Sequence, residues 1–180
     1  MYIWIGIDVS QKLKELKRKV EEVYKEMNYN NTIINLPYHI SLKISFEANS
    51  NKVDDIINDL ADYFSSLKPF SIETKAIENE KVICWIRFKE NSEILRIKKE
   101  VNDLLNSKYQ VPLHEYDLDF IFHTTLFMDL DKDKVSMFYE KIKKETSLVP
   151  LKLELRRFLI GTSTNGEPGT YVIVREISTR

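Results

Sequence analysis

The sequence contains a single cysteine and only four glycines among its 180 residues. Cys84 alone cannot form an intramolecular disulfide, which excludes a disulfide-stabilised scaffold and is typical of a reducing compartment. The few glycines form neither a phosphate-binding loop nor a dinucleotide-binding pattern. Because such patterns hold ATP and dinucleotides, an ATP-consuming ligase is not expected.

The chain also lacks a charge of one dominant sign and a long hydrophobic run. Its 27 basic and 28 acidic residues give a net charge of −1, so no broad basic surface for long nucleic acids is expected. No apolar segment approaches the length of a membrane span, and the N-terminus lacks a signal-peptide pattern. We therefore expect a cytoplasmic protein with no membrane partner. The hydrophobic fraction of 43% is sufficient for the core of one ordinary domain.

One short motif occurs twice. The segment Tyr-His-Ile-Ser-Leu-Lys-Ile-Ser-Phe at 38–46 is followed, 84 residues later, by Phe-His-Thr-Thr-Leu-Phe-Met at 122–128. Each copy contains histidine, any residue, a hydroxyl residue and leucine. Both segments have the composition of buried strands, in which successive side chains point to opposite faces.

Alternation along these strands separates an apolar face from a polar one. In the first strand, His39, Ser41 and Lys43 are predicted to share one face. In the second strand, His123, Thr125 and Phe127 are predicted to do so. The opposite faces carry apolar residues suited to a core. Each strand is therefore expected to present an imidazole beside a hydroxyl group.

The two motifs belong to a longer repeat. Tyr2–Ile5 resembles Ile83–Ile86 at an offset of 81, and the apolar stripe of a helix expected over about 10–27, with Ser10 as its N-cap, returns at that offset. A helix expected over about 53–67 has a counterpart around Val135–Ile142. The pattern predicts two copies of a strand–helix–strand–helix–strand unit.

This repeat predicts the architecture. We expect a single bilobal α+β domain spanning 1–180, with halves of approximately 1–80 and 81–180, and a monomer. The first half should end in a hairpin around Glu78–Glu80, and strands over about 150–160 and 170–178 should close the second half. Amphipathic helices need a sheet face to cover, so the helices should lie outside the sheets. The faces that carry the two histidines would then line a central cleft.

Two histidine–hydroxyl pairs suit acid–base chemistry at phosphorus. A neutral imidazole can take a proton from water or a hydroxyl group, while a protonated imidazole gives one to the leaving oxygen. Ser41 and Thr125 can donate hydrogen bonds to the nonbridging oxygens as their negative charge grows. The set fits in-line displacement at a phosphodiester whose own vicinal hydroxyl is the nucleophile or the leaving group, as at an RNA 2′,3′-cyclic end.

Other site chemistries fit less well. A zinc hydrolase needs three protein ligands and the motifs supply two, so no metal and no cofactor are expected. A serine nucleophile with a histidine base would use one pair and leave the second without a role. From another functional class, a noncatalytic module that binds RNA ends or nucleotides remains an alternative.

These paired motifs resemble those of the two-histidine (2H) phosphoesterase superfamily, which includes the 2′-5′ RNA ligases, alias RNA 2′,3′-cyclic phosphodiesterases. The resemblance covers the whole chain and implies two antiparallel-rich sheets facing a cleft. It also implies metal-independent hydrolysis of 2′,3′-cyclic phosphate or 2′-5′ phosphodiester bonds, reversible in some members as RNA ligation, with His39 and His123 catalytic.

The resemblance implies that RNA ends, or small cyclic or 2′-5′ linked nucleotides, are the substrates. A nucleotide-sugar cyclic phosphate is a further alternative. Two positions depart from the family pattern, Ser41 where threonine is commoner and Thr124 where an apolar residue is usual. We expect Thr124 to loosen the packing of its strand. Beyond the motifs, we hypothesise that Lys43 holds phosphate and that Phe127 contacts a base or ribose. His114 has no hydroxyl partner and is interpreted as a surface residue.

Overall fold

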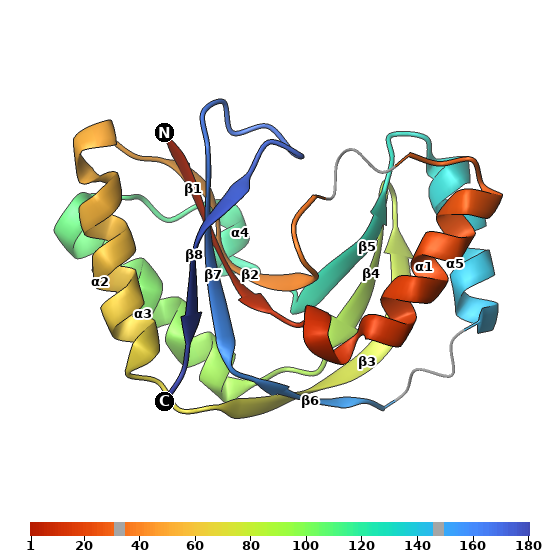
Figure 1. The fold of residues 1–180 in the computed structure, drawn as a ribbon, viewed down its shortest axis with the longest axis horizontal. Coiled ribbons are helices and arrows are strands. Elements are labelled where there is room, and N and C mark those ends of the chain that lie inside the picture. The colour runs from red at the N-terminus through yellow and green to blue at the C-terminus, as the bar shows by residue number, and fades with distance from the viewer. Residues whose placement is uncertain (31–34, 146–149) are drawn as a thin grey trace.

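The computed structural model describes residues 1–30, 35–145 and 150–180, and the strands in these ranges form two four-stranded antiparallel sheets. The first sheet has the order β2-β1-β7-β8, and its strands are β1 (Tyr2–Asp8), β2 (His39–Glu47), β7 (Arg157–Ser163) and β8 (Val172–Ser178). The second has the order β5-β4-β3-β6, and its strands are β3 (Phe70–Glu80), β4 (Ile83–Phe88), β5 (His123–Met128) and β6 (Lys152–Leu155). Figure 1 shows the sheets facing each other.

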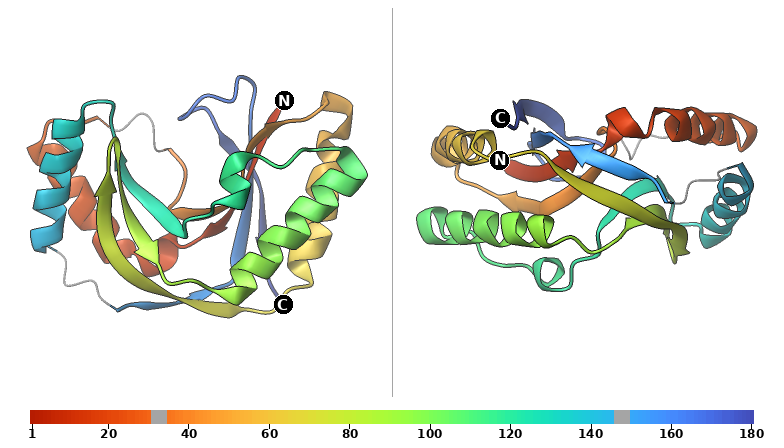
Figure 2. Two further views of the ribbon diagram at one scale, coloured as in Figure 1. Left: turned by 180° about the vertical axis from the view of Figure 1, so that it is seen from behind. Right: turned by 90° about the horizontal axis from the view of Figure 1, so that it is seen from below.

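Helices cover the outer sides of both sheets, as predicted (Figures 1 and 2). In the described ranges the α-helices are α1 (Lys14–Glu26), α2 (Val53–Ser65), α3 (Ser92–Tyr109), the single turn α4 (Glu115–Leu118) and α5 (Lys132–Glu145). Helices α2 and α3 pack on the first sheet, and α1 and α5 lie together on the second. The predicted α+β class, with antiparallel sheets and outer helices, is confirmed.

The two lobes exchange elements. Helix α1 follows β1 of the first sheet, yet it lies on the second, where Tyr24 Oη donates to Leu126 O and Tyr29 Oη donates to Met128 O at 3.0 Å. Helix α3 follows β4 of the second sheet and packs against β2 of the first. Strand β3 comes from the first half of the chain but joins the second sheet by pairing with β4. Strand β7 comes from the second half but joins the first sheet by pairing with β1. Each lobe is therefore built from residues on both sides of position 80.

Strict alternation places the core on one side of each sheet. In β1 the buried residues Ile3, Ile5 and Ile7 have no exposed surface, and they join the helices in a core that runs through both lobes. The residues between them, including Trp4, Gly6 and Asp8, lie on the opposite face. Because cross-strand partners share a face and Asp8 pairs with His39, this is the face of the first motif.

A β-bulge interrupts the alternation at the same point of both motif strands. In β2, Ser41 pairs with Gly6 but Lys43 pairs with Ile5, so Leu42 is the extra residue. In β5, Thr125 pairs with Trp85 but Phe127 pairs with Cys84, so Leu126 is the extra residue. The residues after the bulges consequently turn toward the core instead of the cleft.

Several boundaries differ from those predicted. Ser10 does not cap α1, because Ser10–Lys12 forms a short 3₁₀ turn and both the amide and the hydroxyl of Ser10 donate to Asp8 Oδ1, at 2.7 and 2.6 Å. Strand β3 continues through Glu80, and the hairpin turns at Lys81, whose φ is 51°. The strand predicted over 150–160 divides at Arg156 into β6 and β7, which belong to different sheets. No helix in the described residues is long and apolar enough to cross a membrane.

Candidate active site

The two histidines occupy equivalent places, each as the first residue of its strand. His39 Nδ1 lies 2.7 Å from Pro37 O, and His123 Nδ1 lies 2.8 Å from Ile121 O. A carbonyl oxygen only accepts hydrogen bonds, so each Nδ1 carries the proton and donates it. This assignment leaves Nε2 of each ring as the atom that can accept or deliver a proton.

A tryptophan from the neighbouring strand contacts each imidazole. The Trp4 ring meets His39 edge to face at 4.3 Å between centroids, and Trp85 lies 4.7 Å from His123. Trp4 reaches His39 by lying over Gly6, where a Cβ would overlap the indole ring. Sequence reasoning assigned these tryptophans no role. The available signal was their recurrence at the offset of 81 within the repeated first strand.

The two hydroxyl residues lie two positions along the strand from the histidines, on the same faces. Trp4 Nε1 donates to Ser41 Oγ at 3.1 Å, which leaves the serine hydroxyl proton free to donate elsewhere. The equivalent Trp85 indole donates to Glu78 Oε2 at 3.4 Å instead of to Thr125. Thr125 and His39 together line one pocket, so a residue of each motif faces the same space.

Thr124 ties the two motifs to each other. The His39 amide donates to Thr124 Oγ1 at 3.0 Å, and the threonine is almost fully buried. The prediction that Thr124 loosens its strand is therefore wrong. A hydroxyl group at this position satisfies a main-chain donor of β2 that an apolar residue would leave unpaired.

The protein surroundings favour the neutral form of both rings. The pKa of His39 is lowered to about 4, chiefly by burial and in smaller part by the nearby His123, whereas the Pro37 carbonyl and Asp8 oppose the shift. Burial also lowers the pKa of His123, against the effect of the Ile121 carbonyl. The contact between β2 and β5, with the His39 amide bound to Thr124 beside His123, brings the two rings into one region of the structure. Each ring is thus a proton acceptor near neutral pH.

The residues paired with the two histidines carry opposite charges. Asp8 is the cross-strand partner of His39, and Arg87 is the partner of His123. Asp8 Oδ2 accepts from Arg157, while the Arg87 guanidinium lies 3.5 Å from Glu78 Oε2. The duplicated site is therefore not symmetric in charge.

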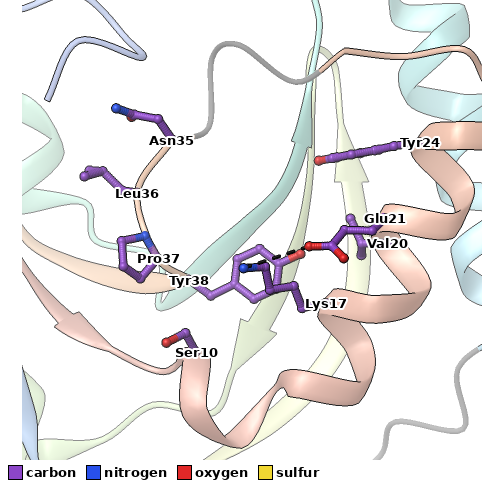
Figure 3. Close-up of a pocket in the computed structure, with 9 residues that line it drawn as sticks. All are labelled: Ser10, Lys17, Val20, Glu21, Tyr24, Asn35, Leu36, Pro37 and Tyr38. Carbon is purple, nitrogen blue, oxygen red and sulfur yellow. Dashed lines mark ion pairs between the residues drawn. The ribbon is translucent and has the colours of Figure 1, made fainter. Parts of the chain in front are cut away.

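Two cavities flank the segment that leads into β2. A mainly apolar pocket of about 140 Å³ opens over His39 and Thr125, and its other walls are Asn35, Leu36, Met128, Pro168, Gly169 and Tyr171. A larger cavity of about 500 Å³ lies between this segment and α1 (Figure 3). Tyr38 points into this second cavity toward Lys17 and Glu21.

Two predicted contact residues are absent from the cleft face. Lys43 is 2% exposed; its ammonium group pairs with Asp117 Oδ2 and donates to Pro112 O at 3.0 Å. Phe127 has no exposed surface and stacks on Phe138 at 4.6 Å between centroids. The predictions that Lys43 holds phosphate and Phe127 contacts a base or ribose are wrong, because the bulge in each strand reverses the face. His114 is exposed, as interpreted, and accepts from the Tyr116 amide at the start of α4.

Among residues 1–30, 35–145 and 150–180, no three His, Cys, Asp or Glu side chains gather in a way that could hold a metal ion. The imidazole and hydroxyl groups described above are the groups of this site that we consider for chemistry. They can exchange protons and donate hydrogen bonds to an anion.

Comparisons with known proteins agree with this fold. The model of the 2′-5′ RNA ligase superfamily matches residues 14–166. The crystal structure of TT0787 from Thermus thermophilus superposes with a TM-score of 0.61 at 14% identity, covering 99% of this chain and 97% of that one. LigT of E. coli complexed with 3′-AMP superposes with a TM-score of 0.58 at 11% identity, covering 98% and 96%. A search of the curated proteins finds no significant match.

Proposed function

We propose that this chain, which belongs to the 2′-5′ RNA ligase superfamily of phosphoesterases, hydrolyses 2′,3′-cyclic phosphate or 2′-5′ phosphodiester bonds of RNA ends or nucleotides by two-histidine acid–base catalysis. One observation carries the proposal. Both histidines have Nδ1 fixed on a main-chain carbonyl, so that Nε2 is the reactive atom, and each has a hydroxyl group two residues along the same strand face.

The mechanism uses the two rings in complementary states. One neutral imidazole takes a proton from water at Nε2 as the water oxygen attacks phosphorus. The bond from phosphorus to one ribose oxygen breaks, and the second imidazole, protonated, gives its proton to that oxygen. The Ser41 and Thr125 hydroxyl groups donate to the nonbridging oxygens, where negative charge grows in the transition state. No cofactor takes part in these steps.

The proton on the second imidazole is supplied together with substrate. Both pKa values are lowered by burial in the free protein, so both rings are neutral near pH 7. A phosphodiester anion between the rings favours the charged form of one of them, because an opposite charge nearby raises the pKa of an imidazole. Binding and protonation are therefore coupled in the proposed mechanism. The roles of His39 and His123 depend on the orientation of the bound substrate.

Related structures support a nucleotide as the ligand. Crystal structures of E. coli LigT are described as complexes with 3′-AMP, NADP⁺ and ATP. In this chain, the pocket over His39 and Thr125 is mainly apolar and opens next to the proposed catalytic groups. A base or ribose in this pocket would place its phosphate between the two histidines.

The test is turnover of 2′,3′-cyclic nucleotides and of a short 2′-5′ linked oligoribonucleotide in EDTA. His39→Asn and His123→Asn keep a donor near the Nδ1 position but lack Nε2, so each should lose about 10²-fold or more in kcat. His114→Asn is the control, because it removes the remaining histidine, which is exposed. Asparagine can also cap α4, so this variant should retain wild-type turnover. Near-ultraviolet circular dichroism would check that each variant is folded.

The pH dependence separates catalysis from binding. A two-histidine mechanism predicts a bell-shaped profile of kcat/KM with its maximum below pH 6.5, because both pKa values lie below that ordinary value in the free protein. Nucleotide binding without turnover, weakened equally by both substitutions, would identify a noncatalytic RNA-end or nucleotide-binding module. Turnover of a nucleotide-sugar cyclic phosphate alone would keep the mechanism and change the substrate. Joining of RNA ends, measured in the same assay, would establish the reverse direction.

A further inference from the structure

A third hollow, of about 370 Å³, lies beside His123 and is separate from the two cavities described above. We name it the His123 groove. Its lining residues are Lys75, Arg87, Phe88, Lys89, Glu90, Phe120, Ile121 and Phe122. The groove adjoins His123 through two residues of its lining. Arg87 is the direct cross-strand partner of His123, and Ile121 O accepts the His123 Nδ1 proton.

The lining carries three cationic side chains and one acidic side chain. Lys75 is exposed and has no ion-pair partner among the described residues. Lys89 pairs with Glu73 at 2.5 Å, and Arg87 lies 3.5 Å from Glu78. Such solvent-accessible pairs contribute little to stability, so a phosphate group can replace either carboxylate at small cost. Arginine can in addition bind two phosphate oxygens at once.

Three phenylalanines line the groove, of which Phe88 and Phe122 are buried and Phe120 exposes part of its ring. Phe120 is partly exposed and meets Phe122 edge to face at 5.0 Å between ring centroids. Cations that follow a phosphate backbone beside aromatic rings are the usual means of binding single-stranded nucleic acids without sequence preference. The groove has both features at one end of the catalytic strand.

The corresponding hollow beside His39 is different. Its charged lining residues are Asp8, Lys12, Glu154, Arg156 and Arg157, at a volume of about 110 Å³. Arg157 is bound to Asp8 and Glu176, and Arg156 to Glu154. The smaller hollow therefore offers a polyanion less room, and its lining carries two carboxylates where that of the His123 groove carries one.

We propose that the His123 groove binds the sugar–phosphate backbone of nucleotides adjoining the reacting end, so that an oligoribonucleotide end is a better substrate than a free cyclic nucleotide. The proposal rests on the proposed function. A mononucleotide in the pocket over His39 and Thr125 leaves the groove empty, because the two hollows share no lining residue. A longer strand reaches Arg87 first and Lys75 and Lys89 beyond it.

The experiment compares kcat/KM for a 2′,3′-cyclic mononucleotide with that for a tetranucleotide carrying the same cyclic end, over a range of salt concentrations. Lys75→Ala should lower kcat/KM for the tetranucleotide relative to that for the mononucleotide by up to about fivefold. This is the most that an exposed ion pair usually contributes. For the tetranucleotide, three phosphate contacts predict a slope of about −2 for log(kcat/KM) against log[salt], and loss of Lys75 should reduce its magnitude by about 0.7. Lys132→Ala, which removes an exposed cation on α5, should change neither quantity.

The outcomes separate the two proposals. If wild type turns over the mononucleotide but gains nothing from added length, or if Lys75→Ala and Lys132→Ala behave alike, the groove proposal is overturned and the proposed function stands. If neither substrate is turned over, the proposed function fails. Fluorescence anisotropy of a labelled tetranucleotide 3′-phosphate then tests the groove directly, with weaker binding to Lys75→Ala than to Lys132→Ala expected. Equal binding to the two variants would overturn it.

Discussion

Substitution of Asp117 by asparagine is expected to destabilise the protein strongly, although this residue lies outside the proposed catalytic groups. The Asp117 carboxylate is the shared partner of two ammonium groups, Lys43 on β2 and Lys98 on α3. The exposed fractions of the three side chains are 1% for Asp117, 2% for Lys43 and 5% for Lys98. Lys98 Nζ also donates to Asp117 O at 2.8 Å. The cluster fastens the single turn α4 to the rest of the first lobe.

The magnitude follows from burial and charge. Removing one member of a buried ion pair typically costs about 3–5 kcal/mol, because the remaining charge is left without compensation. Asp117→Asn leaves two such charges, so the upper part of that range is expected. In a chain of this length 1 kcal/mol corresponds to about 2–4 °C, so a cost of about 4–5 kcal/mol gives a fall in Tm of roughly 8–20 °C. Total stability is usually about 5–15 kcal/mol, so the variant would be marginal.

The assay is equilibrium unfolding in urea, followed by the fluorescence of Trp4 and Trp85. Asp103→Asn is the matched control: it also removes a carboxylate from a lysine pair, but both partners are more than half exposed, and the expected cost is below about 1 kcal/mol. If Asp117→Asn were no more destabilising than Asp103→Asn, the description of this cluster as a buried electrostatic tie would be refuted. Lys43→Met gives a second test. Loss of a phosphate-binding lysine would raise KM without lowering stability, whereas loss of this buried lysine is expected to lower stability without raising KM.

Three further predictions concern the groups around His39. Gly6→Ala should lower the free energy of unfolding, measured in urea, by about 1–3 kcal/mol through overpacking against Trp4. Because it displaces the indole from His39, it should also lower kcat in the turnover assay about ten- to hundredfold. Thr124→Val should cost about 1–3 kcal/mol in the same unfolding assay, because the His39 amide loses its acceptor in a buried position. His39→Asn should destabilise the protein less at pH 4.5 than at pH 7. The folded-state pKa of about 4 lies below the ordinary 6.5, so the stability attached to the neutral ring is present above pH 6.5 and is lost toward pH 4, by at most about 3 kcal/mol.

For each of these three predictions, one experimental result would contradict it. Wild-type turnover and stability in Gly6→Ala would show that the Trp4 ring has room to move. Thr124→Ser keeps the hydroxyl group, and a loss in Thr124→Ser as large as in Thr124→Val would assign the effect to packing. A pH-independent difference between wild type and His39→Asn would show that the imidazole titrates alike in the folded and unfolded chain.

The sequence was sufficient to predict which residues face the cleft at the start of each motif strand, but not beyond the bulge. Alternation assumes that every residue advances the strand by one step, and an extra residue violates that assumption without changing the composition. In β5 the adjacent large apolar residues Leu126 and Phe127 were a readable sign, because both cannot face the core of a regular strand. In β2 the corresponding residue is Lys43, whose charge masked the same signal and suggested a cleft position.

The exchange of elements between the lobes could not be predicted from the hydrophobic periodicity of the sequence, for a different reason. The stripe of Leu16, Val20 and Val23 on α1 shows that one helix face is buried, yet it carries no information about which sheet covers it. The decisive contacts are long-range hydrogen bonds from Tyr24 and Tyr29 to the carbonyl groups of β5. Only the folded chain brings these groups together.

The duplication supplies the same imidazole and hydroxyl pair twice, while the neighbouring residues distinguish the two copies. Asp8 stands across from His39 and is held by Arg157, whereas Arg87 stands across from His123 and opens onto further cations. A polyanion that entered on the His39 side would approach the Asp8 carboxylate, and one on the His123 side would approach a guanidinium. Under the two proposals above, this difference in charge would favour a single direction for a bound strand, with its reacting end at the histidine pair and its remaining phosphates toward Arg87. A direction fixed in this way is also what would fix which imidazole acts as acid and which as base.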